Sequence, residues 1–245
     1  MARDPQLAFT FQTWGGKRKG AGRPPKRKVA GVSHLRRASL SRHHPVHVTL
    51  RLAAGVPSLR GGALFDKVRF ALAAGRERFG FRLVHFSVQS NHLHLIAEAC
   101  DSRALALGMQ GLSVRVARAV NRTLGRHGRL FADRYHSRAL KSPRAVHFAL
   151  RYVLLNARKH QAKAPAVSTD SAAVPAGFID SRSSAAWFGN FQRPEELAFG
   201  TAQTLAQWRA SSGVEAPVVP PQTWLLRQGS HRPGGFDIDD TPGSD

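Results

Sequence analysis

The chain has 245 residues, of which 37 are Lys or Arg and 15 are Asp or Glu, so its formal net charge at pH 7 is +22. Hydrophobic residues make up 42% and charged residues 21% of the chain, proportions that exclude a protein disordered throughout its length. The excess of positive charge, carried by 29 Arg and 8 Lys, indicates a polyanionic partner, most commonly a nucleic acid.

Residues 1–44 are predicted to be a basic, disordered arm. Residues 15–42 contain ten Lys or Arg, no acidic residue and no apolar periodicity, so they repel one another and have little surface to bury. The centre of the arm (KRKGAGRPPKRK) resembles an AT-hook, which lies in a narrow A·T minor groove. The alternative is a solvated tail that binds phosphate without sequence preference. In both cases the candidate DNA-binding residues are Lys17, Arg18, Lys19, Arg23, Lys26, Arg27 and Lys28.

Residues 45–162 are predicted to form a compact α+β domain, and residues 163–245 a partly ordered appendage whose cluster Trp187, Phe188 and Phe191 packs onto it. Apolar periodicity and capping residues place the elements of the domain. Their order, β-α-β-β-α-β followed by a helix, is the ferredoxin-like, split βαβ arrangement. In chain order we expect strand 46–52, helix 64–79, strands 81–88 and 91–98 joined as a hairpin, helix 101–125, strand 130–140, and a helix from 142 to about 160.

The sequence His92-Leu93-His94 is the first candidate for chemistry. Residues two apart on a strand face the same side, so both imidazoles project together and can hold one divalent metal ion. A bare His-x-His is more often a polar pair on an exposed sheet. Here the surrounding strand is strongly apolar, which favours a covered location and hence a site.

The last predicted helix carries a second candidate pair, Tyr152 and Asn156. They are four residues apart and would lie on one helix face, where a phenol can attack phosphorus and an amide oxygen can bind a metal. Alone, such a tyrosine is usually a core residue. The chain has one other tyrosine, Tyr135, on the predicted strand 130–140; we favour Tyr152 as nucleophile because of Asn156.

A basic stripe is predicted on the helix 101–125. Its residues recur at spacings of three and four, and with a net charge of +22 we expect them to contact phosphates rather than only solvent. The stripe consists of Arg115, Arg118, Arg122 and Arg126.

Together these motifs resemble a known family. Residues 91–96 (NHLHLI) resemble the His-hydrophobe-His motif of HUH single-strand nucleases, and 151–156 (RYVLLN) the tyrosine helix of their single-tyrosine branch. The basic arm and residues 131–138 (FADRYHSR) are most similar to the REP-associated tyrosine transposases of bacteria. The family's tyrosine helix commonly continues Asn-Pro, whereas Ala157 follows here.

The resemblance implies a transposase-like single-stranded DNA endonuclease and transesterase. His92, His94 and Asn156 would bind Mg²⁺ or Mn²⁺, and Tyr152 would attack a phosphodiester at a REP-type hairpin, giving a 5′-phosphotyrosine and a free 3′-OH. It also implies action as a monomer or homodimer on single-stranded and hairpin DNA in the bacterial cytoplasm, at the nucleoid.

Other features agree with that location and leave alternatives open. Cys100 is the single cysteine, which excludes an intramolecular disulfide, and the chain has neither a signal-peptide core nor roughly 18 consecutive apolar residues, so we expect no membrane partner. A non-catalytic DNA-binding protein of the same fold and a metal-dependent RNA-processing nuclease are the competing hypotheses.

Overall fold

A computed structural model of the chain describes residues 38–156, 178–192, 197–199, 203–204, 215–230 and 236–237. All of them belong to one unit of the chain, residues 34–245. The arm residues predicted to bind DNA, within 17–28, lie outside the described residues. The elements of the main part are β1 (Val46–Arg51), α1 (Gly62–Ala74), β2 (Glu77–Arg78), β3 (Phe81–Val88), β4 (His92–Ala99), α2 (Ser102–Thr123), β5 (His136–Ala139) and α3 (Pro143–Leu154).

These strands form one antiparallel sheet in the order β2-β3-β4-β1-β5. When the short β2 is set aside, the first and third strands of the chain are central and the second and fourth are at the edges. This is the ferredoxin-like order, so the predicted α+β, split β-α-β-β-α-β fold with an added tyrosine-bearing helix is confirmed.

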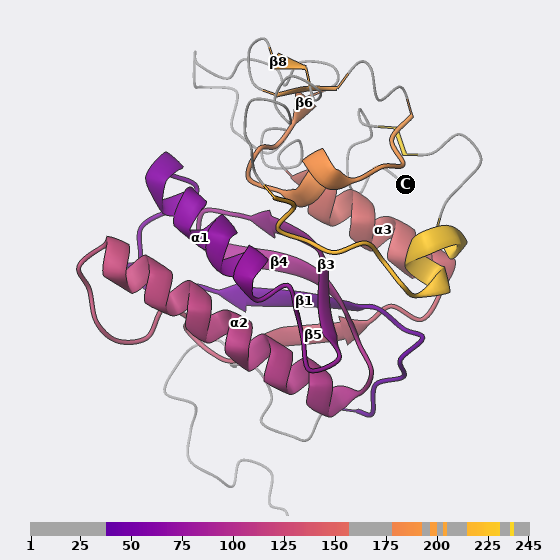
Figure 1. Cartoon of the computed structure of the whole chain (residues 1–245), viewed down its shortest axis with the longest axis horizontal. Coiled ribbons are helices and arrows are strands. Elements are labelled where there is room, and N and C mark those ends of the chain that lie inside the picture. The colour runs from indigo at the N-terminus through magenta and orange to yellow at the C-terminus, as the bar shows by residue number, and fades with distance from the viewer. Residues whose placement is uncertain are drawn as a thin grey trace, which may run out of the picture. The chain divides into compact units, whose positions relative to one another are not determined.

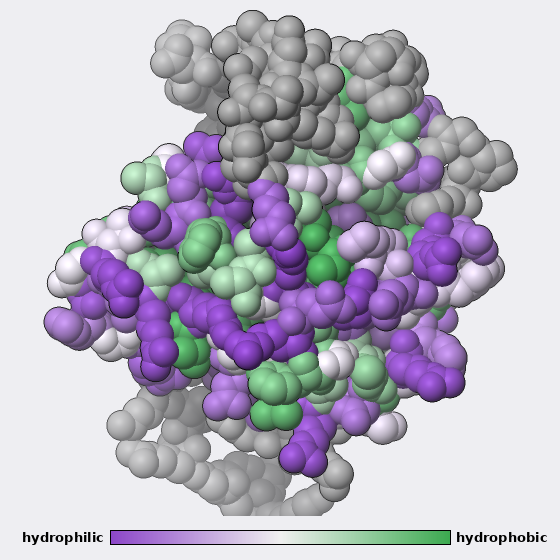
Figure 2. All heavy atoms as spheres, in the orientation of Figure 1, coloured by the Kyte–Doolittle hydropathy of each residue, from purple (hydrophilic) through white to green (hydrophobic). Residues whose placement is uncertain are grey.

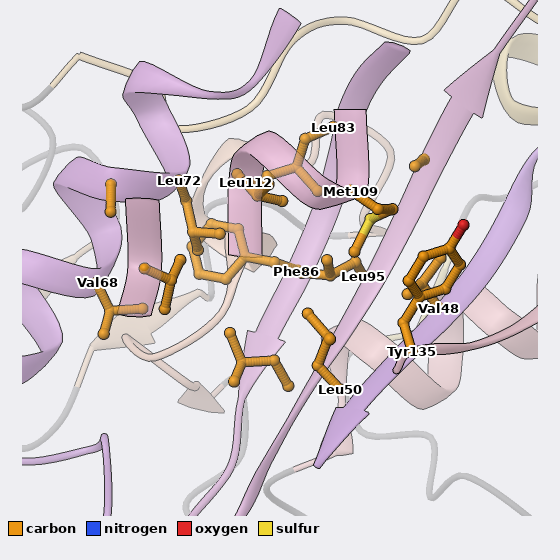
Figure 3. Packing of buried hydrophobic residues seen from close by; sticks show 14 of the residues in the cluster. Val48, Leu50, Val68, Leu72, Leu83, Phe86, Leu95, Met109, Leu112 and Tyr135 are labelled. Carbon is orange, nitrogen blue, oxygen red and sulfur yellow. The ribbon is translucent and has the colours of Figure 1, made fainter. Parts of the chain in front are cut away.

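Helices α1 and α2 cover one face of the sheet and α3 covers the other (Figure 1). Alternation along β1 sends Val46, Val48 and Leu50 into the core with α1 and α2, and the residues between them to the α3 face. Figure 3 shows this first core, in which the side chains of β1, β3 and β4 meet those of both helices. At Gly108 of α2 a Cβ would lie 2.1 Å from the Phe81 ring, so the helix approaches β3 closely because this residue is glycine.

Sequence signals for helix starts are visible in the structure. The Asp101 carboxylate accepts a hydrogen bond from the Ala104 amide at 2.7 Å and caps α2. The Ser142 hydroxyl accepts one from the Ala145 amide at 3.2 Å and caps α3, which has proline in its first turn. Both caps lie where the sequence predicts them.

The α3 face is completed by C-terminal segments. They contain β6 (Phe178–Ile179), a 3₁₀ turn (Ser184–Trp187), β7 (Ala198–Phe199), β8 (Gln203–Thr204) and a π-helical turn (Leu225–Gly229), with β6-β7-β8 forming a small sheet. Phe188 and Phe191 are buried in one cluster with α3, and Trp187 is partly buried against it. The predicted aromatic cluster therefore packs onto the domain.

Two buried carboxylates attach these segments to the sheet. Asp180 receives a two-pronged ion pair from Arg60 at 2.9 and 3.0 Å, at the end of β3. Glu98 on β4 accepts the backbone amides of Gln222 and Thr223 at 2.7 to 3.0 Å. Both carboxylates are almost fully buried, and each accepts several hydrogen bonds. They therefore hold the C-terminal segments in place against the sheet.

Three element ends differ from the sequence prediction. Helix α1 ends at Ala74, not at residue 79, because the chain turns into the hairpin β2–β3, whose turn residues Phe79 and Gly80 have φ of 54° and 74°. Strand β5 has four residues instead of eleven. Helix α3 ends at Leu154, Asn156 is helical again after Leu155, and residues 157–160 lie outside the described residues.

The surface shown in Figure 2 is mainly hydrophilic, as the large number of charged residues in the sequence leads one to expect. On the face seen in Figure 1, hydrophilic residues form bands and hydrophobic residues lie between them in small separate areas (Figure 2). No helix within the described residues has the length and apolar character needed to cross a membrane.

A buried histidine on the α3 face gives a prediction about stability. Burial lowers the pKa of His85 to about 3, and its Nδ1 lies 3.2 Å from the Ser184 hydroxyl oxygen. The unfolded chain takes up this proton near pH 6.5 while the folded chain does not, so stability is lost as pH falls below 6.5. At pH 5 the loss from this group is about 2 kcal/mol.

We expect His85→Gln to flatten this dependence in urea unfolding measured between pH 5 and 7.5. His127→Gln, at an exposed histidine, is the control and should keep the wild-type dependence. An unchanged pH dependence in His85→Gln would show that other groups cause the acid sensitivity.

Candidate active site

His92 and His94 lie side by side on β4, on the face that α3 covers. Leu93 between them joins the opposite core, as the strand alternation predicts. His94 is buried and His92 is half-buried, and their Nε2 atoms are 2.8 Å apart. The expected covered location of the pair is therefore confirmed.

Neighbouring side chains orient both rings. His92 Nδ1 lies 2.6 Å from Asn91 Oδ1, so a proton on this nitrogen would be donated to the amide oxygen and Nε2 would then face His94 as an acceptor. His94 Nδ1 lies 3.3 Å from Thr49 Oγ1 and 3.2 Å from His47 Nε2. The Thr49 hydroxyl can donate or accept, so His94 is satisfied with its proton on either nitrogen.

The structure separates the two tyrosines. The Tyr152 ring on α3 meets the His94 ring edge to face, with centroids 4.8 Å apart, and the His47 ring at 6.0 Å. Tyr135 is 9% exposed and belongs to the core between the sheet and α1 and α2, where Figure 3 shows its ring beside Val48. Only Tyr152 thus shares a sheet face with the two histidines.

Asn156 lies two residues beyond the end of α3, after the capping residue Leu155. Asn156 is itself helical, so the four-residue spacing from Tyr152 spans a one-residue interruption of the helix at Leu155. The side chain is 1% exposed, and neither Oδ1 nor Nδ2 has a hydrogen-bond partner among the described residues. An unpartnered buried amide costs about 1–3 kcal/mol, so this group suits a ligand or water.

The basic stripe of α2 is not part of this site. Arg118 and Arg122 are exposed, but α2 packs on the opposite face of the sheet from Tyr152. Arg115 is half-buried, and its Nη1 donates to the Gly111 carbonyl at 3.3 Å. Arg126 lies beyond the end of α2 at Thr123, so only three of the four residues share the helix.

Two residues of β1 that were not predicted from the sequence, His47 and Thr49, also belong to this site. In the sheet Thr49 pairs with His94 and His47 with Ile96, so both face α3. Burial, and then the neighbouring His136 and Arg138, lower the pKa of His47 to about 4, which keeps it neutral at physiological pH. The sequence does contain the information that places these two residues. Alternation along β1 puts His47 and Thr49 on one face, and a ferredoxin-like sheet places its first strand beside its third.

The donor atoms fit a divalent cation held by two imidazoles. Two nitrogens bound at right angles to one metal at about 2.1 Å are about 3 Å apart, close to the 2.8 Å between the two Nε2 atoms. A proton on His94 Nδ1 would then be held by Thr49 or His47, the second-shell arrangement typical of histidine ligands. Among the residues that the structure describes, no group of three His, Cys, Asp or Glu is placed to hold a metal. Asn156, water and substrate are candidates for further ligands.

Known proteins resemble this chain in structure but not in sequence. No protein-family model matches the chain, and no curated protein matches it in sequence. Among solved structures, it is similar to a REP-associated tyrosine transposase bound to a REP hairpin, with a TM-score of 0.42 and 16% identity over 52% of this chain and 74% of that chain.

Proposed function

We propose that the protein is a metal-dependent single-stranded DNA endonuclease and transesterase with Tyr152 as nucleophile. The observation that carries the proposal is the contact between Tyr152 and His94, whose Nε2 is 2.8 Å from that of His92. A phenol beside two converging imidazole nitrogens is what phosphoryl transfer to tyrosine requires.

In the proposed step the Tyr152 oxygen attacks the scissile phosphorus. The bond from phosphorus to the 3′ oxygen breaks, which leaves a 5′-phosphotyrosine. The phenol gives its proton to solvent, and the departing 3′ oxygen takes up a proton from solvent to become a 3′-OH. A Mg²⁺ or Mn²⁺ ion bound by His92, His94 and Asn156 would offset the phosphate charge that repels a phenolate. Asn91, Thr49 and His47 keep the two imidazoles in the required orientation.

The substrate is proposed to be a hairpin of REP type with a single-stranded flank. This follows from the resemblance of the basic arm and residues 131–138 to the REP-associated tyrosine transposases. The phosphotyrosine bond conserves the energy of the phosphodiester, so strands can be rejoined without ATP. The exposed Arg118 and Arg122 of α2 and the arm are candidate contacts for the duplex part of the hairpin.

A gel assay for a covalent protein–DNA adduct tests the function. Full-length protein is incubated with a 5′-labelled or 3′-labelled oligonucleotide carrying a hairpin, with Mn²⁺, with Mg²⁺ or with EDTA. We expect the fragment 3′ of the break to stay on the protein, and only with a metal. Noncovalent binding without cleavage under every condition would favour the DNA-binding protein, and cleavage of RNA alone the RNA-processing nuclease.

Removal of the arm should weaken binding and flatten its dependence on salt. Residues 1–37 contain ten Lys or Arg. The deletion should end there because Leu40 packs against the core and its amide donates to the Ser102 hydroxyl at 2.9 Å. Each lost phosphate contact lowers the slope of log K against log salt by about 0.9 on duplex DNA. Fluorescence anisotropy at several salt concentrations measures this, and an unchanged slope would show that the arm does not touch DNA.

A further inference from the structure

The edge strand β5 continues the active-site face of the sheet into solvent. His136 pairs with Thr49 and Arg138 with His47, and residues directly opposite each other point to the same side. His94, Thr49 and His136 therefore form one row across three strands. The row begins buried under α3 and ends exposed at His136. Arg138 is likewise exposed beside the half-buried His47.

Helix α3 carries a second row that starts at the same place. Arg144, Phe148 and Tyr152 follow one another at four-residue steps, so they lie along one flank of the helix. Arg144 is exposed, Phe148 is half-buried, and the Arg144 guanidinium lies 5.3 Å from the centre of the Phe148 ring. Lys141, exposed in the connection between β5 and α3, joins the two rows.

This region is rich in positive charge. Residues 134–156 contain five Lys or Arg and no Asp or Glu. Within the part of the chain that the structure describes, carboxylates pair with Arg60, Arg69, Arg76 and Arg82, but none pairs with Arg138, Lys141 or Arg144. Unpaired cations beside an accessible aromatic ring are the combination that binds single-stranded nucleic acid, through phosphate contacts and base stacking.

We infer that Arg138, Lys141, Arg144 and Phe148, here called the β5–α3 strip, bind the single strand next to the scissile phosphate. The inference rests on the proposed function and adds the path of its substrate. Tyr152 and Arg144 are about 12 Å apart along the helix, the length of three to four stacked nucleotides at about 3.4 Å each. One base stacks on Phe148, and the three cations hold the phosphates on either side of it.

A matched pair of triple variants tests the strip. The test variant is Arg138→Gln, Lys141→Gln and Arg144→Gln. The control is Arg78→Gln, Lys67→Gln and Arg103→Gln, which removes two arginines and one lysine, all exposed, from β2, α1 and α2. Arg78 also lies over a phenylalanine, Phe79, at 5.4 Å, so the control reproduces the local chemistry away from the site.

The readout is fluorescence anisotropy of full-length protein with labelled oligo-dT, in EDTA so that no cleavage occurs. We expect the test variant to lower the slope of log K against log salt by about 2, because a single-strand contact contributes about 0.7. The control should keep the wild-type slope. Phe148→Leu should weaken binding about tenfold at fixed salt, whereas Phe79→Leu should not.

The possible failures are distinguishable. The strip would be rejected if both triple variants lowered the salt slope equally, or if the wild-type protein did not bind oligo-dT. Tighter binding of oligo-rU than of oligo-dT would overturn the assignment of the strip to DNA. If the strip binds DNA but no covalent adduct forms with any metal, the proposed role of the strip stands and the proposed nuclease function is rejected. An adduct formed at wild-type affinity by the test variant would retain the nuclease and reject the strip.

Discussion

Replacing Tyr152 with phenylalanine is expected to abolish the covalent protein–DNA adduct while leaving DNA binding intact. The change removes one oxygen and keeps the ring that packs on His94, so the fold should be preserved. Loss of the attacking oxygen should lower cleavage by at least roughly 10³-fold, since removing a nucleophile typically costs more than that. Denaturing gels measure the adduct, and anisotropy measures binding of the uncleaved substrate.

Tyr135→Phe is the matched control, because it makes the same change in the other tyrosine. Its ring lies in the core on the opposite face of the sheet, so cleavage should continue at nearly the wild-type rate. An active Tyr152→Phe combined with an inactive Tyr135→Phe would move the chemistry to residues 131–138. Equal loss in both variants, with lowered melting temperatures, would indicate a structural effect.

Replacing either His92 or His94 with alanine is expected to abolish cleavage and leave hairpin binding unchanged. Cleavage should fall by more than about 100-fold, because even loss of a residue that only orients a metal ligand costs 10- to 100-fold. Binding should persist, since the affinity comes from basic residues outside the pair. Parallel cleavage and anisotropy titrations, with Mn²⁺ varied in the cleavage assay, measure both quantities.

Two milder variants make this result specific to metal binding. Thr49→Val removes the hydroxyl 3.3 Å from His94 Nδ1 and should raise the Mn²⁺ concentration needed for half-maximal cleavage about tenfold, with the maximal rate retained. Asn156→Ala should fall between Thr49→Val and the histidine variants, since both imidazoles remain. If His92→Ala and His94→Ala lose binding as much as cleavage, the histidines are structural.

Local sequence patterns determined most of the fold. Alternation identified β1, the apolar segments 81–88 and 91–98 identified β3 and β4, and the Asp101 and Ser142 caps marked the starts of α2 and α3. These are short-range effects. Side chains alternate along a strand from one residue to the next, and the first amides of a helix, which have no partner within it, are capped by a residue a few positions away. The same period placed His92 and His94 together.

The ends of elements were less predictable, because tertiary contacts set them. The apolar spacing continued past Ala74, yet the chain leaves α1 there to form the hairpin β2–β3. The pattern also ran past Leu154, where α3 ends, so the helix face expected to carry Tyr152 and Asn156 crosses an interruption at Leu155. Spacing along a chain gives a shared helix face only while the helix continues.

Which groups meet at the site was decided by the tertiary structure. Both faces of this sheet are apolar and both are covered by helices, so periodicity shows which residues share a face but not which helix lies over it. The packing of α3 placed Tyr152 against His94, put Tyr135 in the other core and left the α2 arginines on the far side. The ferredoxin-like order predicts that β1 pairs with β4. The register that places Thr49 opposite His94, 45 residues away in sequence, was decided by long-range packing rather than by local pattern.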